Sequence, residues 1–240
     1  MLAIVQARMS STRLPGKVLQ SINGAPIIVW QLRRILQAKN ITKVVVASST
    51  HQSDDVLVET LQNHGFEVVR GDLDNVLNRF VKVLNQHPEE FFVRLTADCP
   101  LFMPEICDRI IEDFLARPCD YLSNTISPTF PNGCDVELVR TETLLKLQDS
   151  NPSPFECEHV TIGIHTRDRF AHCRNFLNKQ NDSHLRWTLD TERDLQFVAE
   201  VYRLFKTREL EFDYSDVMKA LATKQVLLNL ESEHHELASE

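Results

Sequence analysis

Three basic residues stand close together in the stretch VQARMSSTRLPGKVL, which covers residues 5–19. Arg8, Arg13 and Lys17 follow an apolar run, and small hydroxyl residues and Gly16 lie between them. Main-chain N–H groups, a helix N-terminus and three cations in one such loop can converge on an oligophosphate. The G-x-x-x-x-G-K-[ST] and G-x-G-x-x-G patterns are absent, so neither common phosphate loop is present. On charge pattern alone, a solvated basic loop is the alternative.

The composition of the whole chain makes this basic cluster informative. The chain has 240 residues, of which 42% are apolar and 25% are charged, and its formal net charge is −8 at pH 7. The acidic balance argues against a general nucleic-acid binder, which needs a positive field over many phosphates. The six cysteines show no C-x-x-C pair and no finger-like Cys/His spacing, which predicts reduced thiols. No window approaches the roughly 20 apolar residues of a membrane span, and no signal-peptide pattern opens the chain, so we expect a cytoplasmic protein.

Apolar runs alternate with helical patterns over the first 120 residues. The patterns predict strands at residues 2–6, 43–48, 66–70 and 91–95, and helices at 26–38, 53–63, 74–86 and 104–116. Ser53 and Asp54 are candidate caps of the second helix. This alternation predicts the α/β class, with a mostly parallel, Rossmann-like sheet covered by helices on both faces. Because ligands bind beyond the carboxyl ends of such strands, the basic loop and the TADCP turn at 96–100 should face one crevice.

The order of elements changes after residue 120. Turn formers are frequent at residues 124–140 and 150–159, and a helix at 191–206 follows the segment LRWTLD. We expect a single domain over residues 1–230 with a small central insertion at about 122–165, which could serve as a substrate lid or a dimer contact. Residues 231–240 are expected to form a polar tail that frays.

The basic loop resembles the signature of the CTP-dependent sugar cytidylyltransferases, the family that contains the CMP-Kdo and CMP-sialic acid synthetases. Their pattern is approximately A-R-x-x-S-[TS]-R-[LF]-P-G-K, and the residues from Ala7 to Lys17 match it in order. The segments GDLDNVLNRF, VRLTADCPL, CEHVTIGI and LRWTLDTERDLQFV resemble the branch named after spore-coat polysaccharide protein F. The resemblance extends to about residue 220 and implies the fold of nucleotide-diphospho-sugar transferases.

The resemblance implies an activity and a set of site residues. Family members transfer CMP from CTP to a sugar, usually an acidic one, and release pyrophosphate for surface polysaccharide synthesis. The implied substrates are CTP and a sugar, the implied cofactor is Mg²⁺, and the implied catalytic residues are Arg8, Lys17 and Asp98. The implied substrate-binding residues are Ala7, Arg8, Ser11, Arg13, Lys17, Gly71, Asp74, Arg79, Asp135, Glu137, Glu158 and His159.

Two distant aspartates, Asp98 and Asp190, match the family's metal ligands. Mg²⁺ keeps several waters, so one or two carboxylates and phosphate oxygens suffice to bind it. Judged from the residues alone, Asp98 could instead cap the helix at 104–116, and Asp190 could cap the helix at 191–206. For His159, a functional and a structural role are both open.

Other functions are compatible with the same fold, because fold does not determine chemistry. A glycosyltransferase or a sugar-1-phosphate nucleotidyltransferase is one alternative, and a non-catalytic nucleotide-binding partner of a polysaccharide assembly complex is another. Relatives of this size are commonly homodimers that pair through the central insertion, so the resemblance also implies a homodimer.

Overall fold

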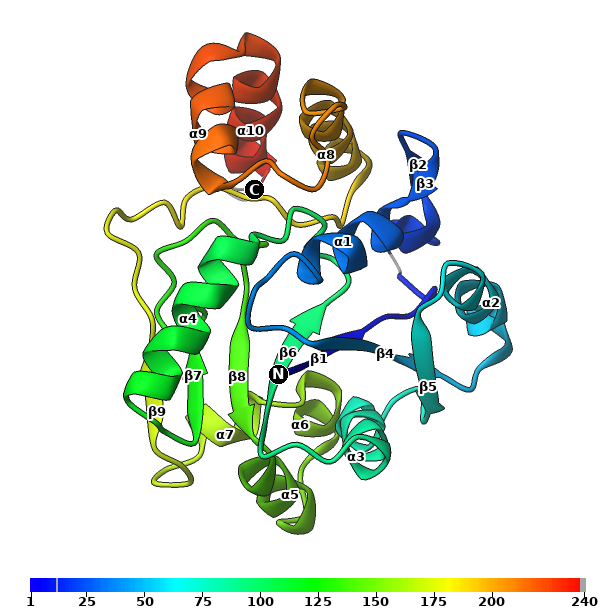
Figure 1. Ribbon diagram of the computed structural model, residues 1–240, viewed down its shortest axis with the longest axis vertical. Helices are drawn as coiled ribbons and strands as arrows, with labels where there is room; N and C mark the ends of the chain where they lie inside the picture. The colour runs from blue at the N-terminus through cyan, green and yellow to red at the C-terminus, as the bar shows by residue number, and fades with distance from the viewer. Residues whose placement is uncertain (12, 238–240) are drawn as a thin grey trace.

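A mixed β-sheet forms the centre of the molecule. The computed structural model describes residues 1–11 and 13–237, with only the backbone for 232–237, so Thr12 of the basic loop and residues 238–240 lie outside the described residues. Within this described part, a seven-stranded sheet has the order β5-β4-β1-β6-β8-β7-β9 (Figure 1). Its strands are β1 (Leu2–Gln6), β4 (Lys43–Ser49), β5 (Glu67–Gly71), β6 (Phe91–Thr96), β7 (Tyr121–Ser123), β8 (Glu137–Arg140) and β9 (Cys173–Asn175).

The strands next to the amino terminus all run in one direction. β5, β4, β1 and β6 are parallel neighbours, whereas β8 is antiparallel to β6. β7 is antiparallel to β8 and parallel to β9. Gln6 of β1 stands opposite Thr96 of β6, so the carboxyl ends of these two strands are level, whereas β4 continues from Ala47, the other partner of Gln6, to Ser49. The predicted α/β class with a mostly parallel sheet is confirmed.

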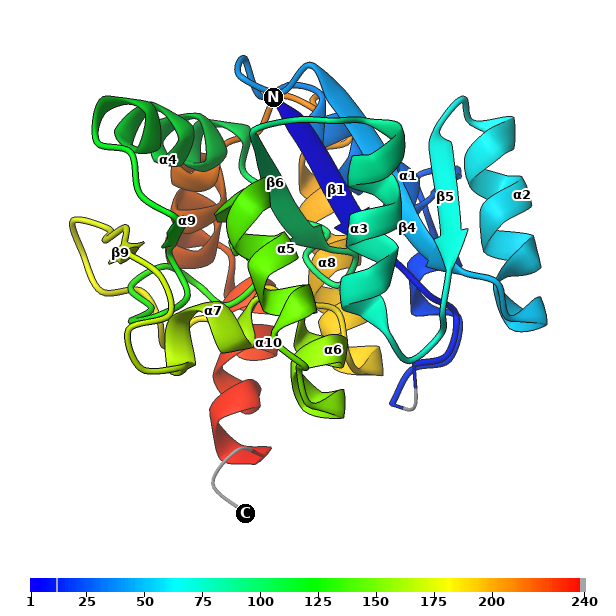
Figure 2. The same cartoon turned by 90° about the horizontal axis from the view of Figure 1, so that it is seen from below.

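Helices cover both faces of the sheet because its central strands are apolar on both sides. In β1, Ala3 and Val5 pack in one core cluster, and Leu2 and Ile4 pack in the other. The first cluster includes α1, α2, α4, α8, α9 and α10, and the second, which lies towards the viewer in Figure 2, includes α3, α5 and α7. The helices are α1 (Ile27–Ile35), α2 (Asp55–Asn63), α3 (Val76–Gln86), α4 (Pro104–Ala116), α5 (Thr141–Asp149), α6 (Pro154–His159), α7 (Ile162–Thr166), α8 (Glu192–Leu204), α9 (Tyr214–Thr223) and α10 (Gln225–Leu237).

The predicted elements of the first 120 residues are all present, with ends shifted by at most three residues. A hairpin of β2 (Ser21–Ile22) and β3 (Ala25–Pro26), which was not predicted, precedes α1. The insertion contains the short helices α5, α6 and α7, which are five to nine residues long and too brief for a clear apolar period. The segment expected to fray continues α10 as far as Leu237.

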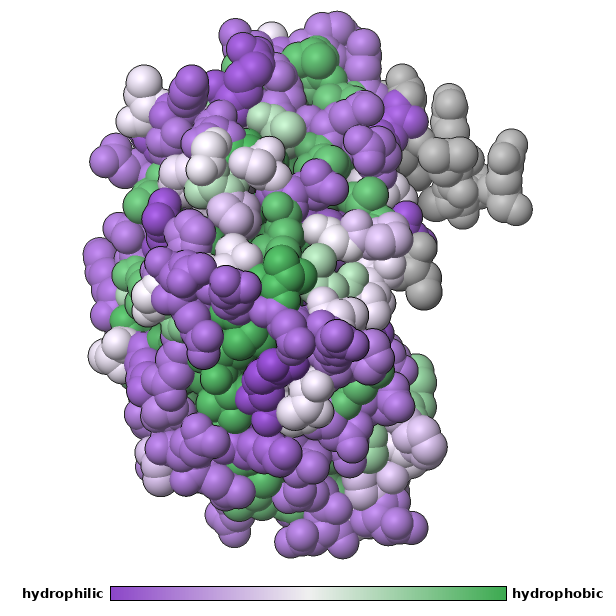
Figure 3. Space-filling view, turned by 90° about the vertical axis from the view of Figure 1, so that its right-hand side faces the viewer, coloured by the Kyte–Doolittle hydropathy of each residue, from purple (hydrophilic) through white to green (hydrophobic). Residues whose placement is uncertain are grey.

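The face of the molecule that Figure 3 shows is mainly polar. Hydrophilic side chains dominate the face shown in Figure 3, and apolar side chains occupy smaller areas between them.

All six cysteines are free and four are buried, in agreement with the expected reduced thiols. Within the described residues, no helix combines the length and the apolar character needed to cross a membrane.

Gly133 is required where the insertion touches the segment before α8. Its φ is +108°, and a Cβ at this position would lie 2.6 Å from the carbonyl carbon of Trp187. We expect Gly133→Ala to lower the free energy of unfolding by roughly 2 to 4 kcal/mol, because backbone strain and overpacking add. Urea unfolding followed by circular dichroism measures the change.

Gly65 offers a matched control for this substitution. It also has a positive φ, +82°, but no atom lies within 4 Å of the place that an added methyl group would take. Gly65→Ala should therefore cost only about 1 kcal/mol, from backbone strain alone. Equal losses in the two variants would contradict the role assigned to the Trp187 contact.

Candidate active site

A buried carboxylate anchors the basic loop that follows β1. Asp54, just before α2, is 0% exposed, and its Oδ1 accepts a hydrogen bond from the main-chain N–H of Met9 at 2.7 Å. Its Oδ2 accepts a second hydrogen bond from Ser49 Oγ. The N–H groups of Ser11 and Gly16 donate to the Met9 carbonyl at 2.9 and 3.3 Å, so the loop folds back on this anchor. Asp54 occupies the N-cap position of α2, as predicted, but its side chain makes no cap bond to the helix and binds the basic loop instead.

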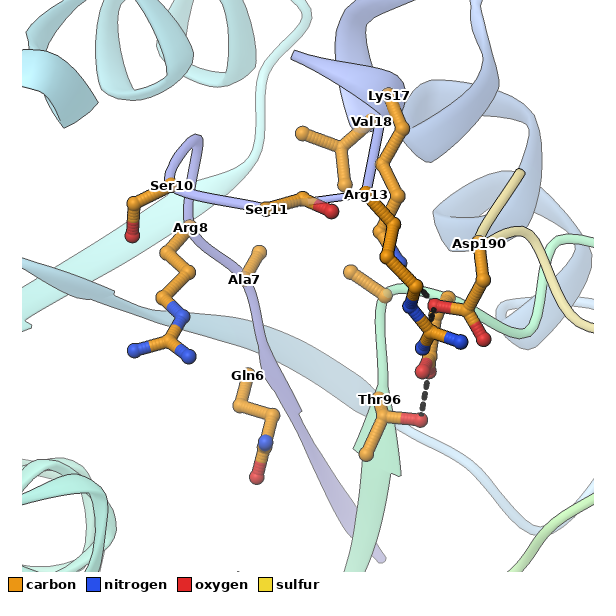
Figure 4. A pocket seen from close by; sticks show the side chains of 12 residues that line it. Gln6, Ala7, Arg8, Ser10, Ser11, Arg13, Lys17, Val18, Thr96 and Asp190 are labelled. Atoms are coloured by element: carbon orange, nitrogen blue, oxygen red, sulfur yellow. Dashed lines mark hydrogen bonds and ion pairs between the residues drawn. The ribbon is translucent and has the colours of Figure 1, made fainter. Parts of the chain in front are cut away.

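Two adjoining cavities open where β1 and β6 end beside the basic loop. We call the first, of about 280 Å³, the loop cavity, and the second, of about 390 Å³, the α3 cavity. They share six lining residues, which are Gln6, Ala7, Arg8, Arg13, Thr96 and Asp98. The loop cavity (Figure 4) adds Ser10, Ser11, Lys17, Val18, Ala97 and Asp190. The α3 cavity adds Val76, Arg79, Arg94, Glu158 and His159.

Positive charge prevails in this crevice, although the chain as a whole is acidic. Five basic side chains line it, namely Arg8, Arg13, Lys17, Arg79 and Arg94. Three carboxylates accompany them, namely Asp98, Asp190 and Glu158. Such a site attracts an anionic ligand and also has hard oxygen donors for a cation.

Three cations surround Asp190. Lys17 Nζ and Arg13 Nη2 lie 2.9 Å from its Oδ1, and Arg186 Nη2 lies 2.6 Å from its Oδ2. Lys17 Nζ also donates to the Leu189 carbonyl at 2.6 Å, and only 11% of the Lys17 side chain is exposed. Burial by itself raises the pKa of Asp190, but the hydrogen bond and charge of Lys17 and the charges of Arg13 and Arg186 outweigh it and lower the pKa. The Lys17 end of the basic loop is therefore held inside the protein and does not fit the alternative of a solvated loop, whereas 62% of the Arg13 side chain is exposed.

Asp98 reaches the same cavity because two main-chain segments meet there. The N–H of Leu189 donates to the Asp98 carbonyl at 2.8 Å, which brings the segment before Asp190 against the turn after β6. The hydroxyl of Thr96 donates to Asp98 Oδ1. Side chains 92 positions apart in the sequence thus line one cavity, although Asp190 follows an irregular segment and not one of the named strands.

The helix-cap alternatives for these two aspartates are excluded. The N-cap of α4 is Met103. The N-cap of α8 is Thr191, whose side chain accepts a hydrogen bond from the main-chain N–H of Asp194. Asp98 and Asp190 instead line the loop cavity.

The two carboxylates form a donor set that suits Mg²⁺. This ion takes oxygen ligands and needs only one or two protein carboxylates when phosphate oxygens and waters complete its shell. Among the described residues, no group of three or more His, Cys, Asp and Glu side chains could hold a metal ion. A Mg²⁺ ion held by Asp98 and Asp190 would need oxygen atoms of a substrate or water to complete its shell.

Arg79 lines the α3 cavity with part of its guanidinium unpaired. It is buried, and its Nε and Nη1 have no hydrogen-bond partner among the described residues. Burial, followed by the charge of Arg8, lowers the pKa of Arg79. Gly71 does not line the cavity, but a Cβ there would lie 2.9 Å from Arg79 Cγ, so glycine leaves room for this side chain. Asp74 is exposed and lines neither cavity, so its position gives its predicted substrate contact no support.

Helix α6 contributes Glu158 and His159 to the wall of the α3 cavity. Glu158 Oε1 lies 3.3 Å from Arg8 Nη2, and half of the Glu158 side chain is exposed. The His159 ring packs on Phe155 with 4.2 Å between ring centroids. His159 thus has a packing contact as well as access to the cavity, and its role in binding stays a prediction.

Glu137 lies beneath the α3 cavity and not in its lining. Its two oxygens accept hydrogen bonds from Arg94, Tyr121 and Thr161. Both oxygens are used inside the protein, so the predicted sugar contact of Glu137 gives way to a supporting role. Glu137 holds Arg94, whose Nη2 donates to Gln6 Oε1 at 3.0 Å.

Asp135 lies in a separate cavity of about 320 Å³. The other lining residues are Asn124, Thr125, Pro128, Phe130, Asn132 and Ser183. Burial, followed by the charge of Asp98, raises the pKa of Asp135 to about 7. Its predicted contact with a sugar stays a prediction, because this cavity is distinct from the two at the basic loop.

Several polar residues of the site were not predicted from the sequence. Gln6, Arg94 and Thr96 line the crevice, and Arg186 pairs with Asp190 from outside its lining. Arg94 could have been found as a charge inside the apolar strand FFVRL, because a buried charge requires a partner. Arg186 stands four residues before Asp190. That spacing brings two side chains together in a helix, and no helix is predicted there, so the sequence did not indicate this pair.

Comparisons with known proteins agree with this geometry. A family profile described as Cytidylyltransferase matches residues 2–232. The spore coat polysaccharide biosynthesis protein SpsF of Bacillus subtilis is 31% identical over 84% of this chain and 86% of its own length. An 8-amino-3,8-dideoxy-manno-octulosonate cytidylyltransferase of Shewanella is 27% identical over 56% of this chain and 55% of its own length.

Among solved structures, a cytidylyltransferase from Leptospira borgpetersenii has a TM-score of 0.89 and 28% identity, covering 94% of this chain and 95% of that one. The likeness thus extends over the parallel strands, the insertion and the carboxyl-terminal helices. The family resemblance of the basic loop is confirmed by sequence and by fold. The chain therefore belongs to the cytidylyltransferase family.

Proposed function

We propose that this protein transfers CMP from CTP to a hydroxyl group of an acidic sugar and releases pyrophosphate, for polysaccharide synthesis. One observation supports the proposal most directly. Arg8, Arg13, Lys17, Asp98 and Asp190 come from three distant parts of the chain and line one crevice. The names of the relatives support a sugar acceptor, since the Shewanella relative is named for an amino derivative of a sugar acid.

The basic side chains suit the charge that develops in this reaction. The sugar oxygen forms a bond to the α-phosphorus, the bond from that phosphorus to the β-phosphate oxygen breaks, and the hydroxyl proton leaves. Negative charge collects on the departing pyrophosphate, where Arg8, Arg13 and Lys17 would neutralise it. One well-placed donor in such a site contributes about 3 to 4 kcal/mol of transition-state stabilisation.

Asp98 and Asp190 are the residues that would hold Mg²⁺. When bound, the ion neutralises phosphate charge and aligns the reacting oxygens. The chain's own contribution is to keep both carboxylates at one cavity, through the Leu189–Asp98 main-chain bond and the cations around Asp190. Nucleotide binding would draw Lys17 and Arg13 towards phosphate, in exchange for their present contacts with Asp190.

Pyrophosphate release tests the proposal. The full chain is incubated with Mg²⁺, each of CTP, UTP, ATP and GTP, and a panel of sugar acids, neutral sugars and sugar 1-phosphates. The expected result is pyrophosphate release with CTP and a sugar acid only. Pyrophosphate release with a sugar 1-phosphate, or sugar transfer from an added nucleotide sugar without pyrophosphate release, would replace the proposal by one of the alternatives of the same fold. Binding of CTP without any turnover would indicate a non-catalytic partner.

The same proposal includes Mg²⁺ dependence, a cytoplasmic location and a homodimer. Chelation with EDTA should abolish pyrophosphate release, and added Mg²⁺ should restore it, because two carboxylates without a cation repel the triphosphate. Light scattering at several protein concentrations measures the oligomeric state.

A further inference from the structure

Asp190 pairs with cations on two sides, one that faces the loop cavity and one that lies outside its lining. On the cavity side it contacts Lys17 and Arg13, and on the other side Arg186 Nη2 lies 2.6 Å from its Oδ2. Arg186 Nε also lies 3.5 Å from Asp194 Oδ1. The orientation of the Asp190 carboxylate therefore depends on where the Arg186 side chain is fixed.

The main chain at Arg186 is held by Asn132, which bonds to Leu185 and Trp187 on either side, and by the carboxyl-terminal helix. Glu231 of α10 is 3% exposed, and its Oε1 accepts a hydrogen bond from the main-chain N–H of Arg186. Glu231 Oε2 has no hydrogen-bond partner among the described residues. Burial, followed by the charge of Asp194, raises the pKa of Glu231 to about 7 against the lowering effect of the Arg186 N–H. Burial of this carboxyl group lowers the free energy of unfolding. An apolar side chain of similar size at the same position would not lower it in this way.

We infer that Glu231 is a positioning residue that acts through Arg186 on Asp190, so that α10 sets the geometry of the nucleotide site from outside it. The inference rests on the proposed function. Glu231 lines neither the loop cavity nor the α3 cavity, so its effect on the reaction is transmitted by the Arg186 backbone and guanidinium.

Two substitutions in the full chain separate positioning from packing. Glu231→Gln keeps an oxygen that accepts from the Arg186 N–H, and Glu231→Leu fills the space without an acceptor. Leu227→Ala is the matched control on the same helix, since Leu227 is 0% exposed and its loss weakens α10 without removing the bond to Arg186. Kinetics are measured well below the unfolding temperature of each variant.

The Glu231 variants should keep or gain stability, whereas Glu231→Leu should lose activity. The pKa of Glu231 is raised above the usual 4.5, so the folded state binds the proton first and its stability falls as the pH rises from about 4.5 to about 7. At pH 8, both Glu231 variants should therefore unfold at the same urea concentration as the wild type or at a higher one. Glu231→Leu should nevertheless lose about tenfold or more in kcat, within the range measured for residues that orient metal ligands. Glu231→Gln should stay within about twofold of the wild type, and Leu227→Ala should lose stability but keep kcat.

Two further readouts do not depend on turnover. Calorimetry should show weaker binding of CTP with Mg²⁺ for Glu231→Leu alone, and hydrogen exchange in residues 185–192 should be faster for Glu231→Leu than for Glu231→Gln. An unchanged kcat and an unchanged exchange rate in Glu231→Leu would overturn the inference. Equal loss of kcat in Leu227→Ala would also overturn it, by showing that helix packing alone is responsible. If the wild type releases no pyrophosphate, the proposed function fails, and the exchange rates still decide the link from Glu231 to Arg186.

Discussion

Replacement of Lys17 by methionine is expected to lower kcat for pyrophosphate release by about 100- to 1,000-fold, the loss typical of one removed charge donor in an active site. The Lys17 side chain is nearly buried and reaches both Asp190 and the Leu189 carbonyl, so its ammonium is held at the cavity and not in bulk solvent. Methionine has a similar length and no charge, so it isolates the electrostatic contribution. Steady-state kinetics with saturating CTP and sugar measure the change.

Lys43→Met provides the control for this experiment. Lys43 pairs with Glu67 at 2.9 Å, on the surface and outside the crevice, and 44% of its side chain is exposed. An exposed pair of this kind contributes only about 0 to 1 kcal/mol to stability, and kcat should stay within about twofold of the wild type. A Lys17→Met variant as active as Lys43→Met would refute the role of the basic loop in charge neutralisation.

Asp98→Asn should lower kcat still further, by about 1,000-fold or more, because the substitution removes a charge from the proposed ion site while keeping its shape. The amide oxygen can still accept the hydrogen bond from Thr96, so folding should change little. The variant should bind CTP without Mg²⁺ as well as the wild type does, or better, since one carboxylate near the phosphates is gone. Calorimetry with and without the ion gives this comparison.

Asp113→Asn is the matched control for Asp98→Asn, at a site outside the crevice. Asp113 pairs with Arg117 and Arg174 and lines neither cavity of the crevice. It should leave kcat and the Mg²⁺ dependence of CTP binding unchanged. If Asp98→Asn retained the Mg²⁺-dependent gain in CTP affinity, the ion would have to be held without Asp98, and the proposed ligand pair would be wrong.

The parallel half of the fold could be predicted because its determinants are local. Short, continuous apolar runs such as residues 2–6 and 43–48 favour buried strands, and the amphipathic segments between them are then crossover helices. The meeting of the basic loop with Asp98 then follows from topology, since parallel strands end at one edge of the sheet. No side-chain contact had to be known for this step.

The contacts that orient the site could not be predicted, because they join residues distant in the sequence. Asp54 reads as a helix cap from its neighbours, yet it binds the N–H of Met9, 45 positions away. Glu137 reads as a sugar ligand, yet packing brings Arg94, Tyr121 and Thr161 around it. These contacts depend on how the helices pack on the sheet, and the pattern of residue types along the chain carries no information about that packing.

The reversed direction of β8 has a consequence for how such a protein can diversify. The loop with Lys17 and the wall with Arg79 belong to the parallel strands, whereas the segment at about 122–165 contains β8, which runs antiparallel to both of its neighbours, β6 and β7. Insertions and exchanges in this segment can therefore accumulate without altering the register of β1 and β6, which keeps the basic loop and Asp98 at one edge of the sheet. We propose that the segment selects the acceptor, so that chimeras that exchange only this segment between homologues would take a new sugar with the same nucleotide.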